Sequence, residues 1–148
     1  MRQKGTVLLV DDDAAFIETN RQILENHGYR VAEAHNGKEC VAQARSLHPD
    51  AIVLDVMMDT KAEGITVTYK LRTSDETRTI PILMVTAVFD SLPLLHEPDE
   101  FWREIDVFLE KPVEPEKLLE WVDKTVKPTP HVPMGRTNGT SRAPLAKA

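Results

Sequence analysis

Five polar or charged side chains of this 148-residue chain stand at the ends of short apolar runs. They are Asp11, Asp12, Asp55, Thr86 and Lys111. Two carboxylates about 4 Å apart repel each other by roughly 4 kcal/mol at an effective dielectric constant near 20, so three clustered carboxylates favour a divalent cation. Oxygen ligands that leave room for water suit Mg²⁺. A lysine beside such a cluster either compensates its charge or binds a phosphate group.

The apolar runs themselves predict buried strands. Apolar residues without alternation are typical of strands that are covered on both faces of a parallel sheet. We predict five strands, of which the second alternates and lies nearer the edge, at residues 6–10, 29–34, 51–55, 80–85 and 106–110. Segments with helical spacing of apolar residues alternate with them, at residues 14–27, 36–47, 64–72 and 115–126. This alternation predicts a doubly wound α/β fold with right-handed crossovers.

The predicted sheet would bring the five polar side chains together. Ligands of open α/β sheets bind at the carboxyl ends of the strands, and all five residues stand there. For Asp55 alone, a cap of the following element is an equally good explanation. Capping does not explain three acids, a hydroxyl and an ammonium group at one edge.

Composition and charge predict one soluble cytoplasmic domain with a tail. The chain is 41% hydrophobic and 28% charged, has no apolar run of the roughly 20 residues that span a bilayer, and shows no signal-peptide cleavage pattern. The formal net charge is −6: residues 1–126 carry −10 and residues 127–148 carry +4. The acidic charge of residues 1–126 argues against a surface for nucleic acid on the folded part. We expect a domain over 1–127 and a disordered, basic, proline-containing tail over 128–148.

The cysteine and the histidines indicate no separate site. Cys40 is the single cysteine, so it forms no internal disulfide, and its apolar neighbours predict a buried helix residue rather than a reactive thiol. The five histidines lack metal-ligand spacing. His27 and His48 lie at predicted helix ends, where a capping role is expected.

Four motifs together resemble the receiver domain of bacterial two-component response regulators. They are VLLVDDD at 7–13, IVLDVMM at 52–58, MVTA at 84–87 and FLEKP at 108–112, and the resemblance extends over residues 6–126. It implies a flavodoxin-like sheet with the strand order 2-1-3-4-5. It also implies that a histidine kinase or phosphotransfer protein passes a phosphoryl group to an aspartate.

The same resemblance implies a role for each site residue. Asp55 would be the phosphoacceptor, Asp12 would bind Mg²⁺ directly, Asp11 would assist largely through water, and the backbone carbonyl of Met57 would be a further ligand.

Other residues would contact the phosphoryl group or change rotamer when it is present. Thr86 would donate a hydrogen bond to a phosphoryl oxygen, Ala87 would leave room for it, and Lys111 would pair with another oxygen. Phe108 matches an aromatic that switches rotamer, although it could also be an ordinary strand aromatic.

The chain departs from the family pattern in two places. Asp59 stands where proline is usual, and the path from there to Gly64 is about one residue longer. The interval from Thr86 to Lys111 is also long, and it lacks the usual Gly-Ala before the fifth strand. We expect residues 88–104, interrupted by two prolines and rich in apolar side chains, to form a partner-binding face with the fifth strand; an irregular helix packed on the sheet is the alternative.

The favoured hypothesis is a phosphorylated receiver that is not itself an enzyme in the ordinary sense and signals through a downstream protein effector. We expect a monomer or a phosphorylation-dependent dimer, with neither nucleic acid nor membrane as a direct partner. One alternative is a receiver-like docking module that is not phosphorylated. Another is a phosphatase of the haloacid-dehalogenase type with Asp11 and Asp13 as nucleophile and acid/base, which leaves Asp55 unexplained.

Overall fold

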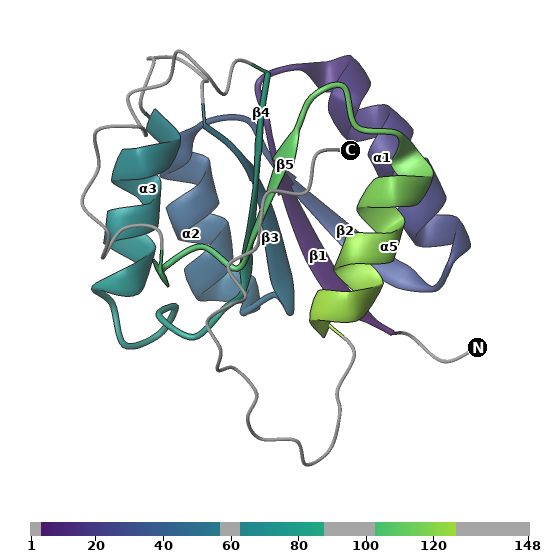
Figure 1. Ribbon diagram of the computed structural model, residues 1–148. Coiled ribbons are helices and arrows are strands. Elements are labelled where there is room, and N and C mark those ends of the chain that lie inside the picture. Colours follow the sequence, from purple (N-terminus) through teal and green to yellow (C-terminus); the bar gives the residue numbers. More distant parts are fainter. Residues whose placement is uncertain (1–3, 57–62, 88–102, 127–148) are drawn as a thin grey trace.

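The computed structural model describes residues 4–56, 63–87 and 103–126, and these form a parallel sheet with helices on both faces (Figure 1). The strands are β1 (Gly5–Val10), β2 (Tyr29–Ala34), β3 (Ala51–Asp55), β4 (Ile82–Thr86) and β5 (Val107–Glu110). The helices are α1 (Ala14–Asn26), α2 (Gly37–Leu47), α3 (Glu63–Arg72) and α5 (Pro115–Val126). The strand order β2-β1-β3-β4-β5 confirms the predicted fold and order.

Each central strand contributes side chains to two separate cores. In β1, Leu8 and Val10 pack in the core under α2 and α3, whereas Val7 and Leu9 pack in the core under α1 and α5. Successive side chains of a strand point to opposite faces, so a strand with a core on each face needs apolar residues at every position. This explains the absence of alternation in β1, β3 and β4. The edge strand β2 keeps an exposed Arg30, as its alternation predicted.

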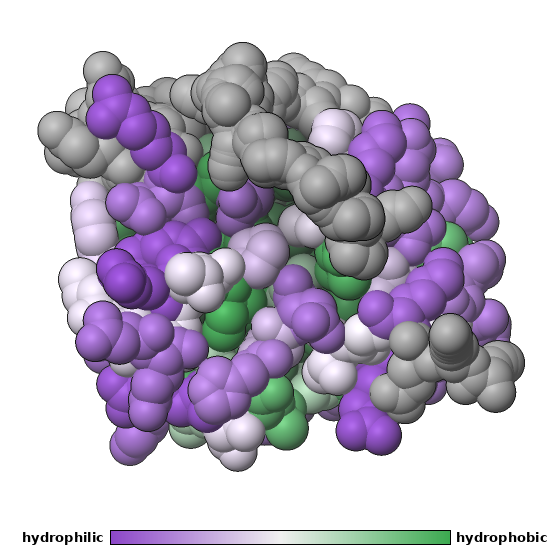
Figure 2. All heavy atoms as spheres, turned by 90° about the horizontal axis from the view of Figure 1, so that it is seen from below, coloured by the Kyte–Doolittle hydropathy of each residue, from purple (hydrophilic) through white to green (hydrophobic). Residues whose placement is uncertain are grey.

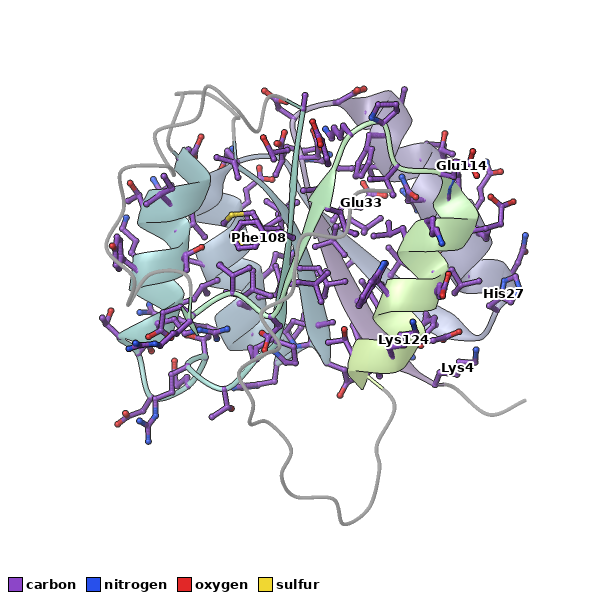
Figure 3. All side chains as sticks on the ribbon, in the orientation of Figure 1. Lys4, His27, Glu33, Phe108, Glu114 and Lys124 are labelled. Carbon is purple, nitrogen blue, oxygen red and sulfur yellow. The ribbon has the colours of Figure 1, made fainter. Side chains whose placement is uncertain are left out.

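Side chains cap the first turns of α1 and α2, and a histidine follows the last residue of each. The Asp13 carboxylate accepts hydrogen bonds from the backbone N–H groups of Ala15 and Phe16, and the Asn36 side chain accepts one from Glu39. His48 ends α2 in the left-handed conformation. His27 ends α1, and its ring Nδ1 lies 2.9 Å from the Ile23 carbonyl oxygen (Figure 3). Both histidines therefore have the capping role expected of them.

Three strands have other bounds than predicted. Strand β1 begins at Gly5 rather than 6. Strand β4 runs over 82–86 rather than 80–85, because Pro81 has no N–H and the N–H of Ile80 donates to Thr77 in a turn. Strand β5 begins at Val107 rather than 106, and Asp106 lies just before it, where its carboxylate accepts the N–H of Ile82 at 2.8 Å. Thr86 is consequently the last residue of a strand.

Some expectations lie outside the described residues. These are the path around Asp59, the tail over 128–148, and the partner-binding face over 88–104, of which only residues 103 and 104 are described. No helix in the described ranges combines the length and the apolarity that crossing a bilayer requires. At the end of the sheet where the strands begin, hydrophilic residues dominate the described surface and hydrophobic residues form separate small patches (Figure 2).

Cys40 is buried in α2, as predicted, and its environment suppresses its reactivity. Burial raises the pKa of the Cys40 thiol from 9.0 to about 12, and the negative charge of Glu63 adds to this. The folded protein at pH 8 should therefore hold roughly a thousandfold less Cys40 thiolate than the unfolded chain. We expect the rate of Cys40 alkylation not to exceed the rate at which the folded protein opens and exposes the thiol. Fast alkylation of the native protein in a mass-detected time course would contradict this.

The same shift has a consequence for stability. Between pH 9 and pH 12 the unfolded chain loses the Cys40 proton while the folded protein retains it, so this group lowers the free energy of unfolding as the pH rises through that range.

Candidate functional site

Three carboxylates meet where β1 and β3 end. One carboxylate oxygen from each of Asp11, Asp12 and Asp55 lies within 4.8 Å of the other two. Asp11 and Asp55 are buried and Asp12 is exposed. Strands β1 and β3 are neighbours, with Val10 opposite Leu54, so their terminal acids are brought together by the register of the sheet. The carboxylates could share one cation that binds oxygen ligands, with the exposed side open to water.

Both oxygens of Asp11 are held by the protein. Its Oδ1 accepts the backbone N–H of Asp13 at 2.9 Å, and its Oδ2 accepts the Lys111 ammonium at 2.8 Å. The Asp13 carboxylate is used to cap α1. Asp11 is therefore oriented by neighbours on two elements, whereas Asp13 has a structural role.

Lys111 contributes a positive charge to this site. Its backbone N–H donates to the Thr86 carbonyl at 2.7 Å, which ties the end of β5 to the end of β4. Its ammonium nitrogen lies 2.8 Å from Asp11 Oδ2 and 3.7 Å from Asp55 Oδ2, and its side chain is 19% exposed. One positive charge thus faces the two buried carboxylates and lowers their mutual repulsion.

Thr86 and Phe108 come from the two strands beyond β3. Thr86 is buried and lies one residue past Val85, which pairs with Asp55. Phe108 pairs with Met84 and is buried in the core under α2 and α3 (Figure 3). The structure therefore gathers Asp11, Asp12, Asp55, Thr86 and Lys111 at the edge where the sequence predicted them. Met57 lies outside the described residues.

Two residues near the site were not identified from the sequence. Gly64 brings the start of α3 against the end of β3: its N–H donates to the Val56 carbonyl at 2.8 Å, and a Cβ at Gly64 would lie 2.6 Å from Val56 Cα. A glycine in the first turn of a helix is the only sequence signal for this close approach. The ring centroid of Phe16 lies 4.4 Å from the Lys111 ammonium nitrogen, whereas helical spacing identified Phe16 only as a core residue.

Comparison with known proteins identifies the family. The family model of the response regulator receiver domain matches residues 7–123. The chain belongs to this family. It is thus a receiver domain of the kind found in two-component systems, as its motifs predicted.

Curated relatives of this receiver differ in length. The receiver is 32% identical to protein PilH of Pseudomonas aeruginosa, over 79% of this chain and 93% of PilH. It is 35% identical to the DNA-binding dual master transcriptional regulator RpaA of Synechocystis sp., over 86% of this chain. It spans only about half (51%) of the length of RpaA.

Solved structures share the fold. The chemotaxis response regulator CheY4 of Vibrio cholerae matches with a TM-score of 0.69 and 26% identity, over 84% of this chain and 99% of that one. A putative response regulator of Chloroflexus aurantiacus matches with a TM-score of 0.70 and 31% identity, over 82% of this chain and 97% of that one.

Proposed function

We propose that this receiver accepts one phosphoryl group on Asp55 in a reaction that needs Mg²⁺, and that the phosphorylated form signals through protein contacts. The observation that carries the proposal is the group of three carboxylates within 4.8 Å, with the Lys111 ammonium 2.8 Å from Asp11 and 3.7 Å from Asp55. Asp11, Asp12 and the Met57 carbonyl would hold the ion with Asp55. When bound, Mg²⁺ would neutralise charge on the transferred group.

In the proposed step an Asp55 carboxylate oxygen attacks the phosphorus atom and forms a new P–O bond. The bond from phosphorus to the donor breaks, and its electron pair leaves with the donor, which is the imidazole nitrogen of a phosphohistidine on the kinase or phosphotransfer protein. The Lys111 ammonium would pair with one phosphoryl oxygen and the Thr86 hydroxyl would donate to another. Hydrolysis of the resulting acyl phosphate by water releases phosphate and restores Asp55.

The geometry favours this proposal over the two alternatives. A docking module that is not phosphorylated has no need of a buried Asp55 beside a lysine and two further acids, because burying such charges is costly. A phosphatase that uses Asp13 as acid/base requires a free carboxylate, but the Asp13 carboxylate caps α1.

We further propose that the output passes through a protein effector. The acidic charge of residues 1–126, −10 in total, disfavours direct contact of the folded part with nucleic acid. Phe108 is our candidate for a side chain that changes rotamer when Asp55 is phosphorylated. It lies on β5, which ends one residue before Lys111.

The proposal is tested by intact mass after incubation with a small phosphodonor such as acetyl phosphate. We expect the wild-type protein to gain one phosphoryl group with Mg²⁺ present and to react at least about a hundredfold more slowly with a chelator, because the three carboxylates then repel both one another and the donor. Ca²⁺, which prefers more ligands and longer distances, is the control cation and should support the reaction poorly. An equal rate in the chelator would contradict the metal requirement.

Lys111→Ala should separate phosphorylation from its structural consequence. Because Lys111 would contact the product phosphoryl group, its loss should slow phosphorylation by roughly tenfold but remove most of the change that phosphorylation causes in the rest of the domain. The measurement is a pair of backbone amide NMR spectra with and without the phosphoryl group, with the exposed Lys117→Ala as control. Shifts of equal size in Lys111→Ala and wild type would contradict the role.

A further inference from the structure

We propose that Phe16 is a positioning residue for Lys111, and this inference rests on the proposed function. The Phe16 ring centroid lies 4.4 Å from the Lys111 ammonium nitrogen, whose other neighbours in the site are Asp11 at 2.8 Å and Asp55 at 3.7 Å. The ammonium group therefore has carboxylates and an aromatic ring as close neighbours.

A lysine at this place needs such a neighbour. Its ammonium is a point charge on a flexible four-carbon stem, so two carboxylates alone define its position only loosely. The face of an aromatic ring attracts a cation and replaces part of its hydration without adding a competing charge. The 19% exposure of the Lys111 side chain shows that the group is partly removed from water, which strengthens this attraction.

The backbone that carries the Phe16 ring is connected to Asp11 through hydrogen bonds. Asp11 Oδ1 accepts the N–H of Asp13, the Asp13 carboxylate accepts the N–H of Phe16 at 3.4 Å, and Asp11 Oδ2 accepts the Lys111 ammonium. Asp11 thus orients the first turn of α1 with one oxygen and Lys111 with the other. The Asn20 side-chain amide also donates to the backbone carbonyl of Phe16 at 2.8 Å.

Phe16 also packs against the core under α1 and α5, and a purely structural role would end there. A leucine could fill much of the same space, but it has no π face. If Phe16 positions Lys111, the electron density of its ring affects the rate of phosphorylation. If Phe16 only packs against the core, the electron density of the ring has no effect on this rate.

The first test replaces Phe16 with phenylalanines carrying one, two and three ring fluorines, which weaken the π face at nearly constant size. We expect the rate of Asp55 phosphorylation by acetyl phosphate with Mg²⁺ to fall stepwise to roughly a third of the wild-type rate, and Phe16→Tyr to retain most of the rate. The matched control is Ile23→Ala, at a partly buried position on α1 against the same core, which should lower the melting temperature without lowering the rate. Equal rates across the fluorinated series would overturn the inference.

The second test asks whether Phe16 acts through Lys111. Phe16→Leu should slow phosphorylation by roughly threefold in the wild-type background and leave the rate unchanged in Lys111→Ala, because the interaction partner is then absent. The same loss in both backgrounds would show a structural role only.

A third readout does not depend on phosphorylation. In the unphosphorylated protein, the ring should shift the NMR signals of the Lys111 Hε protons, and Phe16→Leu should remove this shift. If the wild type is not phosphorylated at all, the proposed function fails, and this shift still decides whether Phe16 holds Lys111. If the wild type is phosphorylated but the shift is absent, only the inference about Phe16 fails.

Discussion

Asp55→Asn is expected to lower the rate of phosphorylation by acetyl phosphate at least a thousandfold, which places it below detection by intact mass. The amide has nearly the same shape as the carboxylate but is a much weaker nucleophile. The substitution also removes one of the three negative charges that lie within 4.8 Å and leaves a weaker site for a divalent cation. The protein should remain folded, because relief of charge repulsion at this edge offsets the altered contact with Lys111.

The control is Asp13→Asn, since asparagine is also a good helix cap and Asp13 has no proposed chemical role. It should be phosphorylated nearly as fast as the wild type. Phosphorylation that persists in Asp55→Asn and disappears in Asp11→Asn would contradict the account. It would favour the phosphatase hypothesis, in which Asp11 is the nucleophile.

Arg72→Ala is expected to reduce the free energy of unfolding by about 3–4 kcal/mol, the largest stability effect that we predict. The Arg72 guanidinium donates to the carbonyl oxygens of Arg78, Ile80 and Glu104 at 2.7–3.1 Å and lies 3.4 Å from the Asp106 carboxylate. It thus joins the end of α3, the turn before β4 and the start of β5. Its side chain is 11% exposed, so truncation removes the guanidinium donor from the part-buried carbonyl groups of Ile80 and Glu104.

Urea denaturation measures this effect. Arg72→Lys should recover only part of the loss, because an ammonium group cannot reproduce the planar fork of the guanidinium. The exposed Arg78→Ala, six residues away, should change the free energy of unfolding by less than about 0.5 kcal/mol. A loss below about 1 kcal/mol in Arg72→Ala would show that Arg72 does not hold these segments together.

The positions of the site acids could be predicted from the sequence because they depend on local patterns. Non-alternating apolar runs specify strands buried on both faces, and the residue after each run must then lie at the same edge. The capping residues Asp13 and Asn36 were predictable for the same reason, since each acts on N–H groups within three residues.

Features that depend on distant residues could not be predicted in this way. The first N–H of β4, that of Ile82, donates to the carboxylate of Asp106, which lies 24 positions further along the chain. Phe16 and Lys111 are on different elements, and helical periodicity identifies the first only as apolar. Gly64 also requires knowledge of the backbone of β3 that it approaches.

The central claim, that Asp55 is the phosphoacceptor, is tested most directly by locating the phosphoryl group in the wild-type protein. Borohydride reduces an aspartyl phosphate to homoserine, which marks the residue, and tandem mass spectrometry of the peptides then identifies its position. After incubation with acetyl phosphate and Mg²⁺, we predict homoserine at position 55 and unchanged aspartate at positions 11, 12 and 13. Homoserine at any of these three positions, or a phosphorylated protein without homoserine at position 55, would contradict the account.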